Sequence, residues 1–197
     1  MKNFLLLVLF VVKVGCCYAD EPPSWTPYKS ISENGAYFAW VDFADTDTLI
    51  DSSDRTWNLT VYDKDSTMIW KKNIIFSDSG NITNNGNYFV VVEDWYYENS
   101  RVVDIYCRDS DDYHFKGKDF AVSSFFLKET ESHQLWVKDY QLENNRIMIE
   151  TVDDKIWEIN FETQKLILKK QNNSVTFGII GMIVLLAIIM YSYVMKK

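Results

Sequence analysis

Apolar and polar side chains alternate along most of the chain with a period of two residues. This is the pattern of β-strands that bury one face, and no stretch between residues 20 and 174 shows the 3.6-residue apolar period of an amphipathic helix. The runs are rich in aromatic and β-branched residues, which favour strands. The clearest runs are 36–43, 56–65, 87–95, 101–109, 146–152, 153–160 and 165–170. The pattern predicts an all-β domain built from antiparallel meanders.

An eight-residue phrase occurs twice in this pattern. Residues 31–38 read ISENGAYF, and residues 82–89 read ITNNGNYF. Asn-Gly between alternating apolar residues indicates a tight hairpin turn, because asparagine and glycine tolerate positive φ. Each phrase therefore predicts a turn that leads into a new strand.

The sequence after each phrase is also repeated. A second run contains VYDKD at 61–65 in the first copy and IYCRD at 105–109 in the second. A third short strand is predicted near 68–72 and near 113–118. A more divergent third copy follows if LENN at 142–145 replaces the turn, and its strands are the last three runs given above. The body is thus predicted to be a series of three meander units.

These units resemble the blades of β-propeller proteins, in which an Asn-Gly turn leads to a strand and then to a V-Y-D-x-x-[ST]-x-x-x-W hairpin. The matching segments are SENGAYF with VYDKDSTMIW, NNGNYF with DIYCRD, and WEINFETQKL at 157–166. The resemblance implies a propeller-blade-like stack of sheets. Closed propellers usually have four to eight blades, so three units imply an open stack or a ring completed by several chains. A small β-sandwich or barrel remains the alternative.

The two ends of the chain are apolar. Residues 1–19 carry Lys2, an apolar run and small residues before Asp20, as in a secretory signal peptide. A lipoprotein anchor at Cys16 is the alternative. Residues 175–194 are uncharged and long enough for one transmembrane helix, which leaves 195–197 as a short cytoplasmic tail. The sequence predicts a single-pass membrane protein whose body, residues 20–174, is extracytoplasmic.

The charge of this body excludes some classes of binding partner. All 28 acidic residues and all but four of the 20 basic residues lie between residues 20 and 174. The strong negative charge repels phosphate backbones and anionic headgroups. Nucleic-acid binding is therefore not expected, and the acidic side chains are expected to form a solvated surface.

Cysteine content excludes an internal disulfide in the predicted mature body. Cys16 and Cys17 lie in the predicted signal peptide, which leaves Cys107. Strand alternation places Cys107 on one face with Val103 and Ile105. We expect a buried, inert thiol, with an intermolecular bridge or a reactive site as the alternative.

Metal and catalytic signals are weak. The acidic loop after residue 41 offers carboxylates for a calcium ion, but it lacks the EF-hand spacing. The candidates are Asp42, Asp45, Asp47, Asp51 and Asp54. The acidic loop at 109–114 has the same ambiguity. His114 and His133 are the two histidines, and neither lies in a nucleophile or zinc motif, even though Ser132 adjoins His133. No catalytic residue and no cofactor is predicted.

Aromatic residues give a better indication of function. They form 16% of the chain, and those on outward strand faces are typical of protein interfaces. Alternation places Tyr62 and Asn58 opposite the face of Trp57, Leu59 and Val61. Glycosylation triplets begin at Asn58, Asn81 and Asn172, and the first two are candidate acceptors if the protein is eukaryotic.

The sequence therefore predicts a non-enzymatic, membrane-anchored β module that binds a protein partner in the membrane or outside it, or assembles laterally with one. A calcium- or carbohydrate-binding surface protein is the first alternative. A hydrolase with an unrecognised site is the second.

Overall fold

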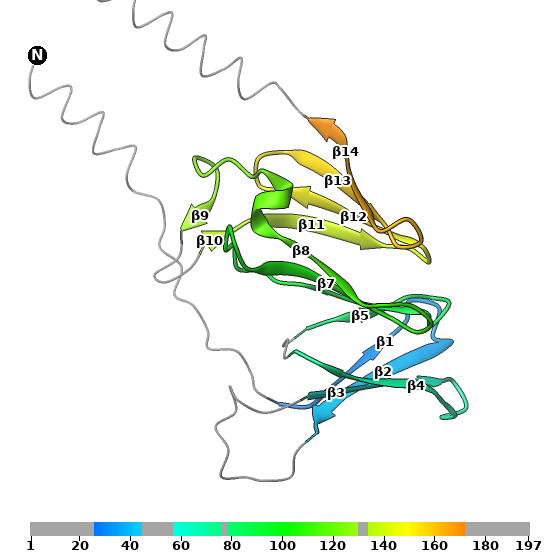
Figure 1. Cartoon of the computed structure of the whole chain (residues 1–197). Coiled ribbons are helices and arrows are strands. Elements are labelled where there is room, and N and C mark those ends of the chain that lie inside the picture. Colours follow the sequence, from blue (N-terminus) through cyan, green and yellow to red (C-terminus); the bar gives the residue numbers. More distant parts are fainter. Residues whose placement is uncertain (1–25, 45–56, 76–78, 130–133, 172–197) are drawn as a thin grey trace, which may run out of the picture.

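The computed structural model describes residues 26–44, 57–75, 79–129 and 134–171 (Figure 1). Nearly all regular structure in these residues is β. The strands are β1 (Tyr28–Ile31), β2 (Tyr37–Phe43), β3 (Trp57–Asp63), β4 (Met68–Ile74), β5 (Asn81–Ile82), β6 (Tyr88–Val92), β7 (Arg101–Cys107), β8 (Tyr113–Lys116), β9 (Lys128–Glu129), β10 (Gln134–Leu135), β11 (Val137–Leu142), β12 (Arg146–Thr151), β13 (Lys155–Asn160) and β14 (Lys165–Gln171). A single turn of 3-10 helix, η2 (Gly117–Phe120), follows β8.

The strands form three four-stranded antiparallel meanders. Sheet 1 has the order β1-β2-β3-β4, sheet 2 has β5-β6-β7-β8, and sheet 3 has β11-β12-β13-β14. Strands β9 and β10 form a small separate ribbon. The all-β prediction and the three strands predicted in the third copy are confirmed. Each sheet is a blade-like unit of four consecutive strands. One predicted strand is too long, because β8 ends at Lys116 and the chain then turns into η2.

The repeated phrase is the β-turn that joins the first two strands of sheets 1 and 2. Gly35 has φ +67° and Gly86 has φ +70°, the left-handed conformation that an Asn-Gly turn needs. The preceding asparagines hold both turns in the same way. The side-chain oxygen of Asn34 accepts hydrogen bonds from Ser32 Oγ and the Ala36 amide, at 2.9 and 3.0 Å. Asn85 accepts the equivalent bonds from Thr83 and Asn87.

Sheet 2 lies between sheets 1 and 3 (Figure 1). One core cluster joins sheet 1 to sheet 2 and includes Trp57, Trp70 and Phe89. A second cluster joins sheet 2 to sheet 3 and includes Ile105, Cys107 and other residues. Strand β7 is therefore buried on both faces from Val102 to Cys107. The predicted burial of Cys107 is confirmed, and burial raises the pKa of its thiol, which keeps the thiol protonated and unreactive.

No helix among the described residues is long and apolar enough to cross a membrane. The predicted signal peptide at 1–19 and the predicted membrane span at 175–194 both lie outside the described residues.

Candidate interaction surface

Sheet 1 has one face in the core and one face on the outside of the stack. Ala39, Val41, Leu59 and Val61 point into the core and are fully buried. On the opposite side, Asn58 and Thr60 are buried and Asp42 is half-buried. The other residues of that side, Lys29, Ile31, Phe38, Trp40, Tyr62, Met68 and Lys71, form what we call the open face. The sequence prediction that Tyr62 lies opposite Trp57, Leu59 and Val61 is confirmed.

An apolar row crosses the open face on four neighbouring strands. The register pairs Ile31 with Phe38, Phe38 with Tyr62, and Tyr62 with Met68. The two ends of the row, Ile31 and Met68, are 60% and 59% exposed. In its middle, the rings of Phe38 and Tyr62 are stacked with their centroids 5.0 Å apart. Phe38 and Tyr62 are half-buried, so the row is most exposed at its two ends. A partly exposed apolar patch that spans a sheet is typical of an interaction site.

The next row gives the open face its charge. Lys29 on β1 pairs with Trp40 on β2, and Lys71 lies at the other end of the same row on β4. Both lysines are exposed, and the indole of Trp40 is 38% exposed. The ammonium of Lys29 lies 3.9 Å from the ring centroid of Phe38, a cation–π contact. An aromatic centre with cations at both edges suits a partner that is apolar in the middle and acidic at its margins.

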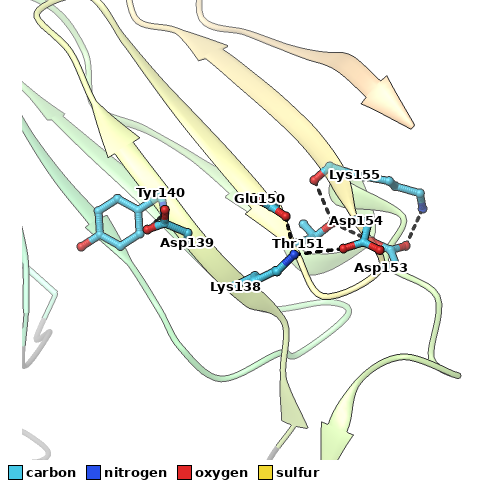
Figure 2. A network of polar contacts seen from close by, with 8 residues as sticks. All are labelled: Lys138, Asp139, Tyr140, Glu150, Thr151, Asp153, Asp154 and Lys155. Carbon is cyan, nitrogen blue, oxygen red and sulfur yellow. Dashed lines mark hydrogen bonds and ion pairs between the residues drawn. The ribbon is translucent and has the colours of Figure 1, made fainter. Parts of the chain in front are cut away.

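The outer face of sheet 3, at the other end of the stack, has a different chemistry. Its carboxylates and cations pair with one another. Glu158 accepts from Arg146 at 3.2 Å and lies 3.6 Å from Lys169. Lys138 contacts Glu150 at 2.6 Å and Asp154 at 3.1 Å (Figure 2). Ion pairs of this kind suit a solvated surface, because burying them under a partner would cost desolvation energy.

The turn between β12 and β13 contains one buried carboxylate, Asp153 (Figure 2). Its oxygens accept from Thr151 Oγ1 at 2.5 Å and from the Ser123 amide at 3.1 Å, and they lie 2.8 Å from Lys155 Nζ. Burial alone would raise the pKa of Asp153, but the hydrogen bonds from Lys155, Thr151 and Ser123 hold the pKa below its ordinary value.

Asp153→Asn is expected to lower the free energy of unfolding by about 3 kcal/mol at pH 7, because Lys155 loses its buried partner. A depressed carboxyl pKa stabilises the fold above the unfolded pKa of about 3.9. The difference between variant and wild type should therefore shrink as the pH falls below about 4. Denaturant unfolding at several pH values measures this. A constant difference down to the lowest pH would contradict the pKa assignment.

A hollow of about 710 Å³ lies where the first strands of the three sheets approach one another. It is lined by both apolar and polar side chains, including Ile31, Glu33 and Glu143. Asn81 Nδ2 donates to the Tyr140 hydroxyl at 2.7 Å across the interface between sheets 2 and 3. Burial raises the pKa of Tyr140 and keeps it neutral. Polar contacts such as this one join the sheets around the hollow. The described residues that line the hollow include no histidine, cysteine or lysine.

The predicted metal ligands are mostly outside the described residues. Asp42 lies near the end of β2 and is half-buried, whereas Asp45, Asp47, Asp51 and Asp54 fall in the undescribed 45–56. Within the described ranges, no group of three or more histidine, cysteine, aspartate or glutamate side chains is arranged to hold a metal ion.

Of the two histidines, the structure describes one. His114 is exposed on β8, where it pairs with Asp104 in register, while Ser132 and His133 lie outside the described residues.

The candidate glycosylation sites are placed on the outside of sheet 1 and in the hollow. Asn58 lies on the outward side of β3 between Asp42 and Asn73, and it is buried. Asn81 lines the hollow and is half-buried. Asn172 lies outside the described residues. Glycosylation at Asn58 and Asn81 stays a prediction.

Comparison with known proteins adds little to this picture. No family model and no curated protein matches the chain. Six chains of known structure match. Among them is the crystal structure of HIRA(644-1017), at a TM-score of 0.48 and 9% sequence identity, with 84% of this chain covered. This chain spans 45% of the length of that one. The blade-like description therefore rests on the strand order and register of the three sheets themselves.

Proposed function

We propose that the protein is a membrane-anchored, extracytoplasmic β module that works by binding another protein through the open face of sheet 1. The observation that carries this proposal is the row Ile31, Phe38, Tyr62 and Met68, which spans all four strands of its sheet with both ends exposed and its two central rings half-buried. A patch of this kind is costly to leave in water, and a partner would remove that cost.

The position of the open face supports a partner outside the membrane. Sheet 3 ends at Gln171, only three residues before the apolar segment 175–194. Three residues span at most about 11 Å, so a membrane helix at 175–194 would keep the end of β14 close to the bilayer. Sheet 1 lies at the opposite end of the stack (Figure 1). The open face would then be presented away from the anchoring membrane.

The proposal is tested by purifying tagged full-length protein from its native membrane in mild detergent and identifying what accompanies it. We expect a stoichiometric partner. The double variant Phe38→Asp and Tyr62→Asp should lose that partner, because carboxylates in the apolar row would be desolvated on binding. The matched control is Ile167→Asp on the exposed outer side of sheet 3, which should keep it. A lone wild-type protein, or equal losses in both variants, would overturn the proposal.

A further inference from the structure

The strand registers make three rows of residues equivalent in the three sheets. In each sheet, the last residue of the first strand pairs with the second strand, which in turn pairs with the third. The rows are Ile31, Phe38 and Tyr62 in sheet 1, Ile82, Phe89 and Tyr106 in sheet 2, and Leu142, Ile147 and Ile159 in sheet 3. Sheets 1 and 2 therefore carry the same three residue types at equivalent positions.

The rows of sheets 2 and 3 are each covered by the neighbouring sheet. Ile82, Phe89 and Tyr106 are buried in the cluster that contains the core face of sheet 1, with its Ala39, Val41, Val61 and Trp70. Ile147 and Ile159 are fully buried in the cluster that contains Val90, Val92 and Ile105 of sheet 2. In both cases an aromatic or branched row packs under a sheet face that mixes aliphatic and aromatic side chains. The row of sheet 1 has the same chemistry but lies open.

The turns of sheets 1 and 2 differ in the same way as their rows: the turn of sheet 2 is covered and that of sheet 1 is open. Gly86 in sheet 2 is buried: the ring of Tyr37 lies where a side chain would begin, 2.6 Å from an added Cβ. Trp70 Nε1 donates to the Gly86 carbonyl at 2.7 Å. At the equivalent Gly35, which is exposed, no atom of the described chain lies within 4 Å of an added Cβ. Sheet 1 thus has the receiving turn without the aromatic residues that fill it in sheet 2.

A third contact also recurs from one unit to the next. The side-chain amide of Asn34 donates to the Asn84 carbonyl at 3.0 Å, and that of Asn85 donates to the Asn144 carbonyl at 3.1 Å. The same turn asparagine therefore joins unit to unit at both interfaces. Row and asparagine recur at both interfaces, and the glycine adds a further contact where sheet 1 meets sheet 2.

A second copy of this chain does not offer the face that this stacking needs. The core faces of sheets 1 and 2 are already buried inside the described stack. The sheet faces left at its ends are the aromatic open face and the outer face of sheet 3. The latter has Arg146 and Glu158 where sheet 1 has Tyr37 and Val61 on its core face. Stacking the open face on that surface would bury ion pairs at a net cost.

We infer that the open face of sheet 1 receives a β-sheet from a different protein, stacked as the next unit of the series. The partner sheet presents aliphatic and aromatic side chains to the row Ile31, Phe38 and Tyr62, as the core face of sheet 1 does to sheet 2, and an aromatic side chain to Gly35. It carries carboxylates at its margins, opposite Lys29 and Lys71. This inference rests on the proposed function and adds to it the class of partner and the geometry of contact.

Site-specific photo-crosslinking of full-length protein in its native membrane tests the inference. A photoreactive residue replaces Met68 on the open face or, as the matched control, Ile167 on sheet 3, since both are exposed. We expect the Met68 site to give one major adduct, mapped by mass spectrometry to a strand of another protein in which apolar and polar residues alternate, and the Ile167 site to give at least tenfold less. An adduct with this chain's own peptides, with a loop or helix, or no adduct at Met68 would overturn the inference.

Gly35→Ala separates this inference from the proposed function. Within the described chain the added methyl has open space, so the fold should be kept, but the methyl would meet the partner's aromatic residue as it would meet Tyr37 at Gly86. We expect at least a tenfold loss of the Met68 adduct. Asn34→Ala is the control for damage to the turn itself. It removes the side-chain amide that donates to the Asn84 carbonyl but adds no group at position 35. Suppose that the partner co-purifies with the wild-type protein but Gly35→Ala does not reduce the Met68 adduct. The stacking inference then fails, and the proposed function stands.

Discussion

Phe120→Ala is expected to lower the free energy of unfolding by about 4 kcal/mol, the largest effect of any single substitution we consider. Phe120 ends the 3-10 turn η2 and is fully buried in the cluster between sheets 2 and 3. Its ring centroid lies 4.7 Å from that of Trp136, 5.8 Å from Trp157 and 6.3 Å from Phe115. Alanine would leave a cavity among three aromatic rings, which cannot all collapse into it.

Equilibrium unfolding in denaturant, followed by tryptophan fluorescence, measures this change. The matched control is Phe125→Ala in the following loop, because the Phe125 side chain is 76% exposed. The control should change the unfolding free energy by less than about 0.5 kcal/mol. A loss below about 1 kcal/mol for Phe120→Ala would mean that sheets 2 and 3 are not packed through this cluster.

Gly86→Ala is expected to destabilise the protein by about 3 kcal/mol, and Gly35→Ala by only about 1 kcal/mol. Both glycines have a positive φ, so both substitutions carry the strain of about 1 kcal/mol that an L-residue has there. Only at Gly86 does the new methyl also meet the Tyr37 ring, and overpacking of this kind adds about 2 kcal/mol. The difference between the two variants therefore measures how tightly sheet 1 packs on the turn of sheet 2.

The same denaturant titration gives both values. Equal destabilisation by the two alanines would contradict the placement of Tyr37 on Gly86. The double variant Gly86→Ala and Tyr37→Ala is a further check, since removing the ring should make the methyl at Gly86 less costly.

The order of strands could be predicted from the sequence because it depends on local signals. The Asn-Gly pairs needed positive φ and have it at Gly35 and Gly86. Alternation predicted which residues share a face of β3, and those residues do. Such features depend on residues close in the sequence, so one sequence is enough to find them.

The stacking could not be predicted in the same way. Alternation gives a strand two faces but does not say which sheet covers each, and β7 is buried on both because sheet 2 is central. Met68 was also missed as a member of the open face. The register shifts between Val61 and Tyr62, so that Trp70 pairs with Val61 and Met68 pairs with Tyr62. This bulge puts Met68 and Trp70 on opposite faces, whereas strict alternation puts them on the same one.

The sequence also could not show whether the acidic loop or the histidines form a site. Carboxylates are frequent in this chain, and only a fold can bring scattered ones together. The signal that could have located the open face was the repeat itself. Ile31 and Phe38 align with Ile82 and Phe89 in the repeated phrase. When the units stack in order, the equivalent side chains are buried in sheet 2 and lie on the outer face of sheet 1.

Oxidative footprinting of Met68 tests the central claim most directly. Full-length protein is labelled with hydroxyl radicals in its native membrane and again after purification to a monomer, and oxidation is compared at Met68 and at Tyr97, an exposed reference outside sheet 1. If a partner sheet covers the open face, Met68 should be oxidised at least fivefold more slowly in the membrane, with Tyr97 unchanged. Equal oxidation of Met68 in both states would contradict the account.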